Sequence, residues 1–247
     1  KKLAEKLPGK TVAGGEIPGG CEEYSQQTRR PEGRTWGGGR HLRAIRRVSR
    51  IVMTRTGSDI LIDGLIGWGV DTVFGMPGDG INGIMEAIRQ RDGRIRFIQV
   101  RHEESAALMA CAHAKWTGRL GCCLATSGPG GVHLLNGLYD AKFDKAPVIA
   151  ITGLPYHDLI DTFTQQDVDL SRLFTHVAAY STRVMSAQHV ENAVALACRV
   201  ALTQRGVGHV SVPVDVQEQE LEDTEPSARN VAHHVSFAHS DGVRMPD

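Results

Sequence analysis

The chain has 247 residues, 41% of them hydrophobic and 23% charged, and its 28 Lys and Arg balance 28 Asp and Glu. This composition is typical of a globular protein large enough to bury a full core without disulfides. It contains no run of 18 apolar residues and no apolar segment near its first residue, so neither a membrane span nor a secretory signal is predicted. We therefore expect a cytoplasmic protein.

The character of the chain changes near residue 52. Residues 1–52 carry 12 Lys and Arg, 5 Asp and Glu, and nine glycines, whereas the remaining residues carry 16 basic and 23 acidic side chains. We expect residues 1–52 to be a disordered basic segment outside the fold. A basic tail can bind nucleic acid, but this one lacks the interleaved aromatics of a single-strand binder, so no nucleic-acid partner is predicted. Translated upstream sequence before a start at Met53 is another interpretation.

Residues 53–222 are predicted to form one domain of alternating helices and strands. Ile60, Leu61 and Leu65 share one helical face, and Gly69 can end that helix. Apolar patterns predict further helices at residues 81–89, 103–116, about 128–142 and 190–202. They predict strands at residues 72–74, 95–100, 120–125, 148–152, 178–184 and 209–214.

This alternation predicts an α/β fold, with a parallel sheet of about six strands and helices on both faces. The strands at 120–125 and 148–152 are apolar throughout, as in a sheet covered on both sides. Binding sites in such folds lie at the carboxyl ends of the strands. Apolar residues become sparse after residue 222, and residues 223–247 are interpreted as a linker towards a further domain.

Glu103 is the first candidate functional residue, because it lies just after the end of a predicted strand and opens a predicted helix. A carboxylate there is stabilised by about 0.3–1 kcal/mol through the helix dipole. The helix face that follows is rich in Ala and Met, so we expect apolar neighbours and an acid–base role. A purely structural charge in the first helical turn is the alternative.

The turn at residues 126–131, Thr-Ser-Gly-Pro-Gly-Gly, is the second candidate. Proline is favourable at the first position of a helix, and glycines allow a ligand to approach the backbone. An anion-binding helix start and a simple tight turn both remain open for this segment.

Several familiar motifs are absent. His102 and Glu103 begin an H-E-x-x-H pattern, but Ala106 stands where the second histidine is required. The glycines of residues 75–80 do not make a G-x-G-x-x-G fingerprint. The five cysteines form no C-x-x-C pair, so neither a disulfide framework nor a zinc site is predicted. The sequence therefore predicts no metal ligands.

Four segments together resemble a known family. They are VFGMPGDGINGIMEAI (73–88), QVRHEESAALMACAHAKWTG (99–118), CLATSGPGGVHLLNGLYDAKFDKAPVIAITG (123–153) and GVGHVSVPVDVQ (206–217). In this order they resemble the N-terminal, pyrimidine-binding domain of thiamine-diphosphate enzymes of the pyruvate oxidase, quinone-dependent pyruvate dehydrogenase and acetolactate synthase group. The resemblance covers roughly residues 57–222 and implies the flavodoxin-like fold of that domain.

The resemblance also implies roles for individual residues. Glu103 would hydrogen-bond N1′ of the cofactor's aminopyrimidine ring and so activate the cofactor towards a 2-oxo acid, with pyruvate as the default. The residues implied to line or approach the cofactor or substrate are Pro77, Gly78, Thr126, Ser127, Gly128 and Pro129. Asn136 is a less direct polar contact, and His133 occupies a position where relatives vary, with a packing role equally open.

Departures from the family pattern concern the substrate side. Relatives often have Phe-Gln-Glu where this chain has Phe163, Thr164 and Gln165. Phe163 and Gln165 are therefore substrate-side candidates whose polar partners are changed. Gly78-Asp79-Gly80 is not the magnesium motif of the family, which lies in another domain with a later asparagine.

The family implies partners for this domain. Mg²⁺ and, in some members, FAD would be bound mainly by other domains, and the complete enzyme would be a homodimer or homotetramer. Three interpretations follow: an incomplete oxidase or synthase that is inactive alone, a separate subunit of a two-chain decarboxylase, or a non-catalytic binding module.

Overall fold

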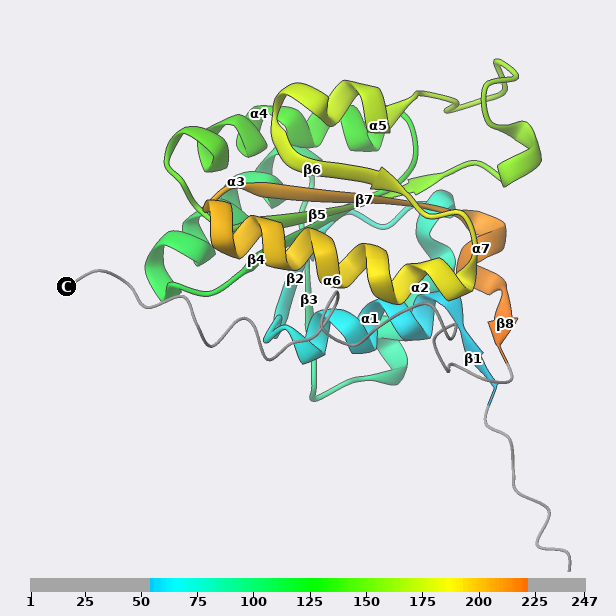
Figure 1. Ribbon diagram of the computed structural model, residues 1–247, viewed down its shortest axis with the longest axis horizontal. Coiled ribbons are helices and arrows are strands. Elements are labelled where there is room, and N and C mark those ends of the chain that lie inside the picture. Colours follow the sequence, from blue (N-terminus) through cyan, green and yellow to red (C-terminus); the bar gives the residue numbers. More distant parts are fainter. Residues whose placement is uncertain (1–53, 222–247) are drawn as a thin grey trace, which may run out of the picture. The chain divides into compact units, whose positions relative to one another are not determined.

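The computed structural model describes residues 54–221. The predictions for residues 1–52 and 223–247 lie outside this range. Six parallel strands form the central sheet in the order β3-β2-β4-β5-β7-β6 (Figure 1). They are β2 (Thr72–Gly75), β3 (Arg96–Gln99), β4 (Gly121–Ala125), β5 (Val148–Leu154), β6 (Ala178–Arg183) and β7 (Val207–Pro213). A small antiparallel pair joins β1 (Arg55–Thr56) to β8 (Glu220–Leu221).

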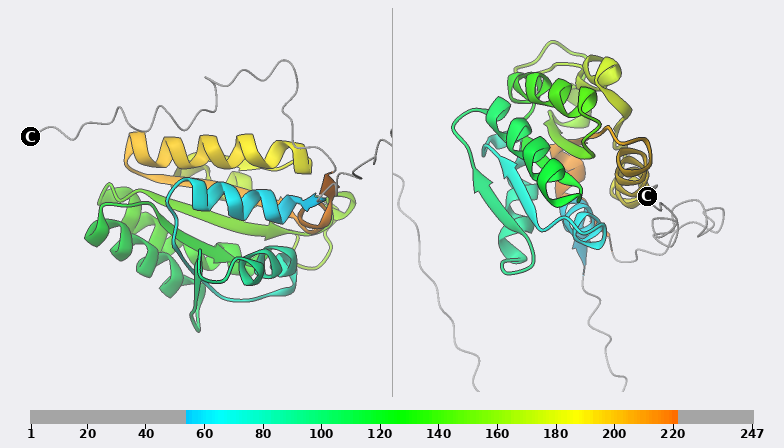
Figure 2. Two further views of the ribbon diagram at one scale, coloured as in Figure 1. Left: turned by 90° about the horizontal axis from the view of Figure 1, so that it is seen from below. Right: turned by 90° about the vertical axis from the view of Figure 1, so that its left-hand side faces the viewer.

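Helices cover both faces of the sheet (Figure 2). One face carries α1 (Gly57–Gly67), α2 (Asn82–Gln90) and α6 (Ala187–Gln204). The other carries α3 (Glu103–Thr117), α4 (Pro129–Phe143) and α5 (Leu170–Leu173). The short α7 (Val214–Glu218) follows β7, and single 3-10 turns lie at Asp79–Ile81, His157–Leu159 and Phe174–His176. The predicted α/β fold with a parallel sheet of about six strands is confirmed.

Local signals in the sequence explain where two helices begin. Thr56 caps α1: its hydroxyl accepts the backbone N–H of Asp59 at 3.1 Å, and the Asp59 carboxylate accepts the backbone N–H of Thr56 at 2.9 Å. Pro129 opens α4 after Gly128, whose φ of 60° suits glycine. The start of α4 is thereby held directly after β4.

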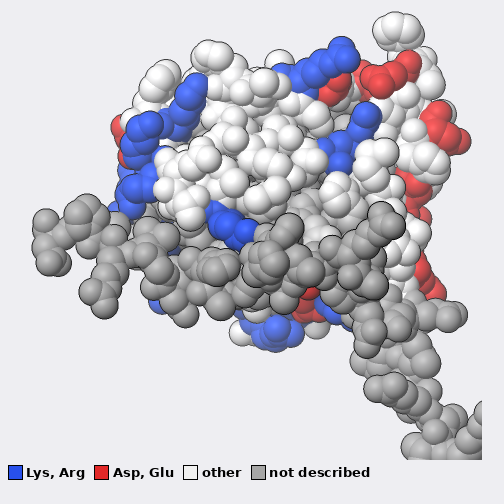
Figure 3. All heavy atoms as spheres, in the orientation of Figure 1, with Lys and Arg blue, Asp and Glu red and all other residues white. Residues whose placement is uncertain are grey.

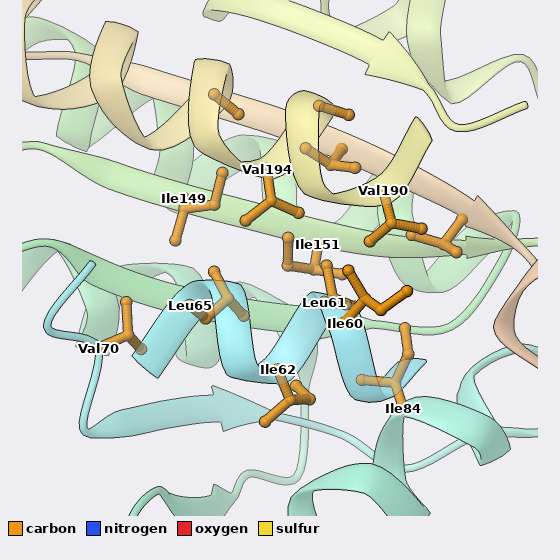
Figure 4. Close-up of a cluster of buried hydrophobic side chains, with 14 of the residues drawn as sticks. Ile60, Leu61, Ile62, Leu65, Val70, Ile84, Ile149, Ile151, Val190 and Val194 are labelled. Atoms are coloured by element: carbon orange, nitrogen blue, oxygen red, sulfur yellow. The ribbon is translucent and has the colours of Figure 1, made fainter. Parts of the chain in front are cut away.

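Aliphatic side chains fill the layer between the sheet and the α1–α6 face. Leu61 and Leu65 of α1 and Val194 of α6 pack against Ile149 and Ile151 of β5, and all five are at most 1% exposed (Figure 4). Burying a side chain of this size contributes about 1.5–3 kcal/mol. This layer fixes the sheet on one side.

On the opposite face, α3 and α4 approach each other closely because their contact residues are small. A Cβ added to Gly137 of α4 would lie 2.6 Å from the Leu108 backbone nitrogen and 2.7 Å from the Ala107 Cβ. The alanine-rich face of α3 is therefore matched to a glycine on α4. This close approach brings the first turn of α3 beside the first turns of α4.

The elements differ from the sequence prediction mainly at their ends. The strand predicted at 209–214 is β7, which begins at Val207, and Val214 belongs to α7. Helix α6 begins at Ala187 rather than at residue 190. None of the helices within residues 54–221 has the length and apolar character needed to cross a bilayer.

Candidate functional site

The loops that leave the carboxyl ends of the strands carry most of the candidate residues. Parallel pairing puts the ends of β2, β3, β4 and β5 at one edge of the sheet. Pro77 and Gly78 follow β2, Glu103 follows β3, and residues 126–129 follow β4. In the orientation of Figure 1, acidic side chains gather at the edge where β7 leads into α7 (Figure 3).

Glu103 is the first residue of α3 and is only 7% exposed. Its Oε2 lies 3.0 Å from Nδ1 of His133 on α4. Within residues 54–221, no hydrogen bond involves Oε1 of Glu103. The carboxylate is therefore held at one oxygen, and the other oxygen is available to a ligand.

The sequence did not predict a polar partner for Glu103. The nearest polar partner is the imidazole of His133, which α4 presents because it packs beside α3. The ring of His102, the residue before Glu103, stacks on that of His133 with centroids 4.6 Å apart and planes at 26°. His102, Glu103 and His133 are called the edge cluster below.

Asn136 does not reach Glu103 in this structure. Its Nδ2 donates to Oε1 of Glu104 at 2.6 Å, one residue further along α3. The backbone N–H of Glu104 in turn donates to Nδ1 of His102 at 3.3 Å. Asn136 thus contacts the edge cluster through Glu104.

The turn after β2 packs against the turn after β4. The backbone N–H of Gly80 donates to Oγ1 of Thr126 at 3.1 Å. A Cβ on Gly78 would lie 2.6 Å from Cβ of Thr126, so glycine is required there by the close approach of the two turns. Pro77 and Pro129 are exposed at the rim of this arrangement.

Ser127 and Gly128 contact the loop of residues 155–169, which follows β5. The Ser127 hydroxyl donates to Oε1 of Gln166 at 2.7 Å, and a Cβ on Gly128 would lie 2.7 Å from the Gln166 carbonyl oxygen. Gln165 and Gln166 both line a cavity of about 350 Å³, together with Asp79 and Ser127. The bond between the β4 turn and this loop is thus made by Gln166, which follows the predicted Gln165.

Phe163 does not pack on the described domain. Its side chain is 99% exposed, and its φ of 62° is in the left-handed region that a bulky residue rarely adopts. The backbone N–H of Phe163 donates to Oδ2 of Asp167 at 3.0 Å, which holds the loop tip in this conformation. The structure therefore brings Gln165 towards the cavity and directs Phe163 into solvent.

The base of this loop is held by a charged pair. The backbone N–H of His157 donates to Oδ1 of Asp215 on α7 at 3.0 Å, and Nδ1 of His157 pairs with the other carboxylate oxygen. The hydrogen bond to Asp215 raises the pKa of His157 above its usual value. The loop is thereby joined to α7 on the side of the sheet edge where the cavity lies.

Sequence reasoning missed two functional candidates, His102 and Gln166, and left the role of His133 open. His133 lies thirty positions after Glu103, so no local motif joins them. Its place one turn into a helix that starts at a strand end was nevertheless visible in the sequence, and it could have directed attention to this edge.

Comparison with known proteins gives the family. Residues 55–173 match the model described as "Thiamine pyrophosphate enzyme, N-terminal TPP binding domain". The "Putative thiamine pyrophosphate-containing protein YdaP" of Bacillus subtilis is 42% identical over 167 residues, which are 68% of this chain and 29% of that protein.

Two further relatives bear the names of enzymes. "Pyruvate oxidase" of Lactiplantibacillus plantarum is 41% identical, over 62% of this chain and 26% of its own length. "Acetolactate synthase isozyme 2 large subunit" of Escherichia coli is 37% identical, over 75% of this chain and 33% of its own length. The chain thus spans a third or less of these relatives. The domain described here belongs to the N-terminal thiamine pyrophosphate binding domain family of thiamine pyrophosphate enzymes.

Proposed function

We propose that this chain binds the aminopyrimidine side of thiamine diphosphate (thiamine pyrophosphate) in an enzyme that decarboxylates a 2-oxo acid, pyruvate by default. The enzyme would be of the pyruvate oxidase or acetolactate synthase type. The bound cofactor would supply an electron sink for the reacting carbon. The observation that carries this proposal is Glu103, a 7% exposed carboxylate at the strand-end edge with one oxygen lacking a hydrogen-bond partner in residues 54–221.

The residues at the carboxyl ends of the strands suit thiamine diphosphate. A carboxylate in a largely buried position is suited to hold or accept a proton from a ring nitrogen of a bound heterocycle. His133 hydrogen-bonds Oε2 and so orients Oε1 for that contact. The glycine-rich turns at Gly78 and Gly128 keep side-chain bulk away from the edge, with Pro77 and Pro129 at its rim.

The remaining predicted contacts complete one wall of the site. We assign Thr126 and Ser127 to the wall that faces the cofactor, Asn136 to holding Glu104 in place, and Gln165 to the substrate side. Phe163 would reach the substrate only if the tip of the loop turned towards the site on assembly. The support is the cavity of about 350 Å³ that Ser127 and Gln165 line.

We infer that the chain by itself does not turn over substrate. The enzymes it resembles are more than twice as long as the matched segment, since that segment covers 26–33% of their length. Mg²⁺, the diphosphate and any FAD would be bound by residues other than those described here. A homodimer or homotetramer, or a separate partner subunit, would supply the other wall of the site.

The test is Glu103→Gln in the complete enzyme that contains this domain. We expect turnover to fall by about 10²–10⁴-fold, the contribution of a positioned acid–base group, while cofactor affinity measured by calorimetry stays nearly unchanged. Glu86→Gln is the control and should leave turnover unchanged, because Glu86 is an exposed glutamate on α2 that pairs with Arg89 and has no part in the candidate site. Equal turnover in Glu103→Gln and the unaltered enzyme would refute the proposed role.

A further inference from the structure

The edge cluster combines two imidazoles and a carboxylate from two separate elements. His102 and Glu103 come from the start of α3, and His133 comes from α4. Each residue offers one ligand atom, and these three atoms lie within 4.8 Å of one another. Within residues 54–221, this is the one group of three metal-ligating side chains with such spacing.

The distances are close to those of a metal site. Nδ1 of His133 and Oε2 of Glu103 are 3.0 Å apart, which is about the separation of two ligands that bind one ion at a right angle with bonds of about 2.1 Å. Bonds of that length permit at most about 4.2 Å between two ligands, and the three ligand atoms lie within 4.8 Å of one another, so any pair wider than about 4.2 Å would have to approach slightly. The side chains of His102 and His133 are 51% and 46% exposed, which leaves them room to turn.

The neighbours of the cluster can orient a metal-bound imidazole. Ligating histidines commonly donate their second ring N–H to a carboxylate. Oε2 of Glu104 lies 4.0 Å from Nδ1 of His102, and Asn136 holds the other oxygen of Glu104. Nδ1 of His102 accepts the backbone N–H of Glu104 in this structure, so a rotation of the ring that breaks this bond would let a protonated Nδ1 turn to the Glu104 carboxylate and leave Nε2 as the ligand atom.

We propose that His102, Glu103 and His133 bind a divalent transition-metal ion of the Zn²⁺ class, with water completing the coordination. Two imidazoles and one carboxylate favour Zn²⁺, Fe²⁺ or Co²⁺ over Mg²⁺, which prefers oxygen ligands. This inference goes beyond the proposed function, because the ion is bound directly by the chain and needs no cofactor. The ion would use Oε2 of Glu103, beside His133, whereas the aminopyrimidine contact of the proposed function uses Oε1.

The experiment uses the full chain without cofactor, with Co²⁺ as a spectroscopic probe and Zn²⁺ in calorimetry. We expect one Co²⁺ site with visible d–d absorption. Zn²⁺ affinity should fall by at least about tenfold in each of His102→Gln, Glu103→Gln and His133→Gln. Circular dichroism of each variant establishes that the fold is retained, and excess Mg²⁺ should not displace Co²⁺.

Two controls separate this site from other histidines. His157→Gln removes an exposed histidine that has one carboxylate partner and should leave Zn²⁺ affinity unchanged. A triple variant combines His233→Gln, His234→Gln and His239→Gln and so removes histidines outside the described residues. It should also retain the Co²⁺ spectrum. The inference is overturned if Zn²⁺ affinity is the same in folded His133→Gln, if Mg²⁺ displaces Co²⁺, or if the triple variant abolishes binding. None of these outcomes depends on the turnover of Glu103→Gln in the complete enzyme, so each proposal can be refuted without the other.

Discussion

Two clusters in this protein pair histidine with polar side chains, and their surroundings differ. One is the edge cluster, and the other is an interior cluster. The interior cluster consists of His209, Thr152, Ser181 and Ser211. Nδ1 of His209 lies 2.8 Å from Oγ of Ser181, and its Nε2 lies 3.0 Å from Oγ1 of Thr152 and 3.2 Å from Oγ of Ser211. Its ring stacks on Phe174 at 3.8 Å, and His209 is 0% exposed. The edge cluster also pairs imidazole with oxygen, but its two histidines are about half exposed.

The comparison sets a histidine with buried partners at both ring nitrogens against two histidines that remain about half exposed. In the interior, both ring nitrogens of His209 have partners on β5, β6 and β7, so the side chain joins three strands. Burial lowers the pKa of His209 to about 3, so its ring is neutral at physiological pH. At the edge, the same residue type can exchange its hydrogen bonds for contacts to a ligand.

The largest expected effect is on stability, from removing the ring that covers His209. Phe174→Ala should lower the free energy of unfolding by about 3–5 kcal/mol, because Phe174 is fully buried and a cavity would remain. Urea unfolding measures the change. Phe143→Ala is the matched control, since Phe143 is 72% exposed and its loss should cost less than about 1 kcal/mol. If the two variants lost similar amounts of unfolding free energy, the conclusion that Phe174 seals His209 in the interior would be wrong.

The next effect is a dependence of stability on pH that originates at His209. The pKa is about 3 in the folded state and 6.5 as the reference for the unfolded chain, so the unfolded chain takes up a proton first as pH falls. The contribution of the neutral His209 ring to the free energy of unfolding is fully present above pH 6.5 and is lost progressively down to pH 3. At pH 4 this loss amounts to about 3 kcal/mol.

Chemical denaturation of the protein and of His209→Gln between pH 7 and pH 4 measures this effect. The variant has no titrating ring, so its stability should fall less steeply over the same interval. Other groups titrate alike in both proteins and cancel in the difference. If stability fell equally steeply with pH in both proteins, His209 would not be the source of the pH dependence.

The smallest effect is expected at the edge. His133→Gln should lower the free energy of unfolding by less than about 1 kcal/mol, because the side chain is 46% exposed and its loss leaves no cavity. Thermal unfolding monitored by circular dichroism measures the change. A loss as large as that of Phe174→Ala would mean that the edge cluster is structural rather than a ligand site.

Much of the fold was readable from local patterns. The apolar runs of β4 and β5 predicted a covered parallel sheet, and the turn with Pro129 predicted the start of α4. The loop of residues 155–169 was not readable in this way, because its conformation depends on contacts with Ser127 and Asp215. For the same reason, Gln166 rather than Gln165 makes the bond to the β4 turn.

The sequence by itself determined that Glu103 follows a strand and opens a helix, because strand and helix periodicities are local properties of the chain. Only the tertiary structure decided what lies beside it. His133 reaches Glu103 because Gly137 and the alanines of α3 let two helices approach, and His209 is sealed because Phe174 covers it. Such pairings depend on packing between residues distant in sequence, and packing decides which polar groups are buried and which remain open to a ligand.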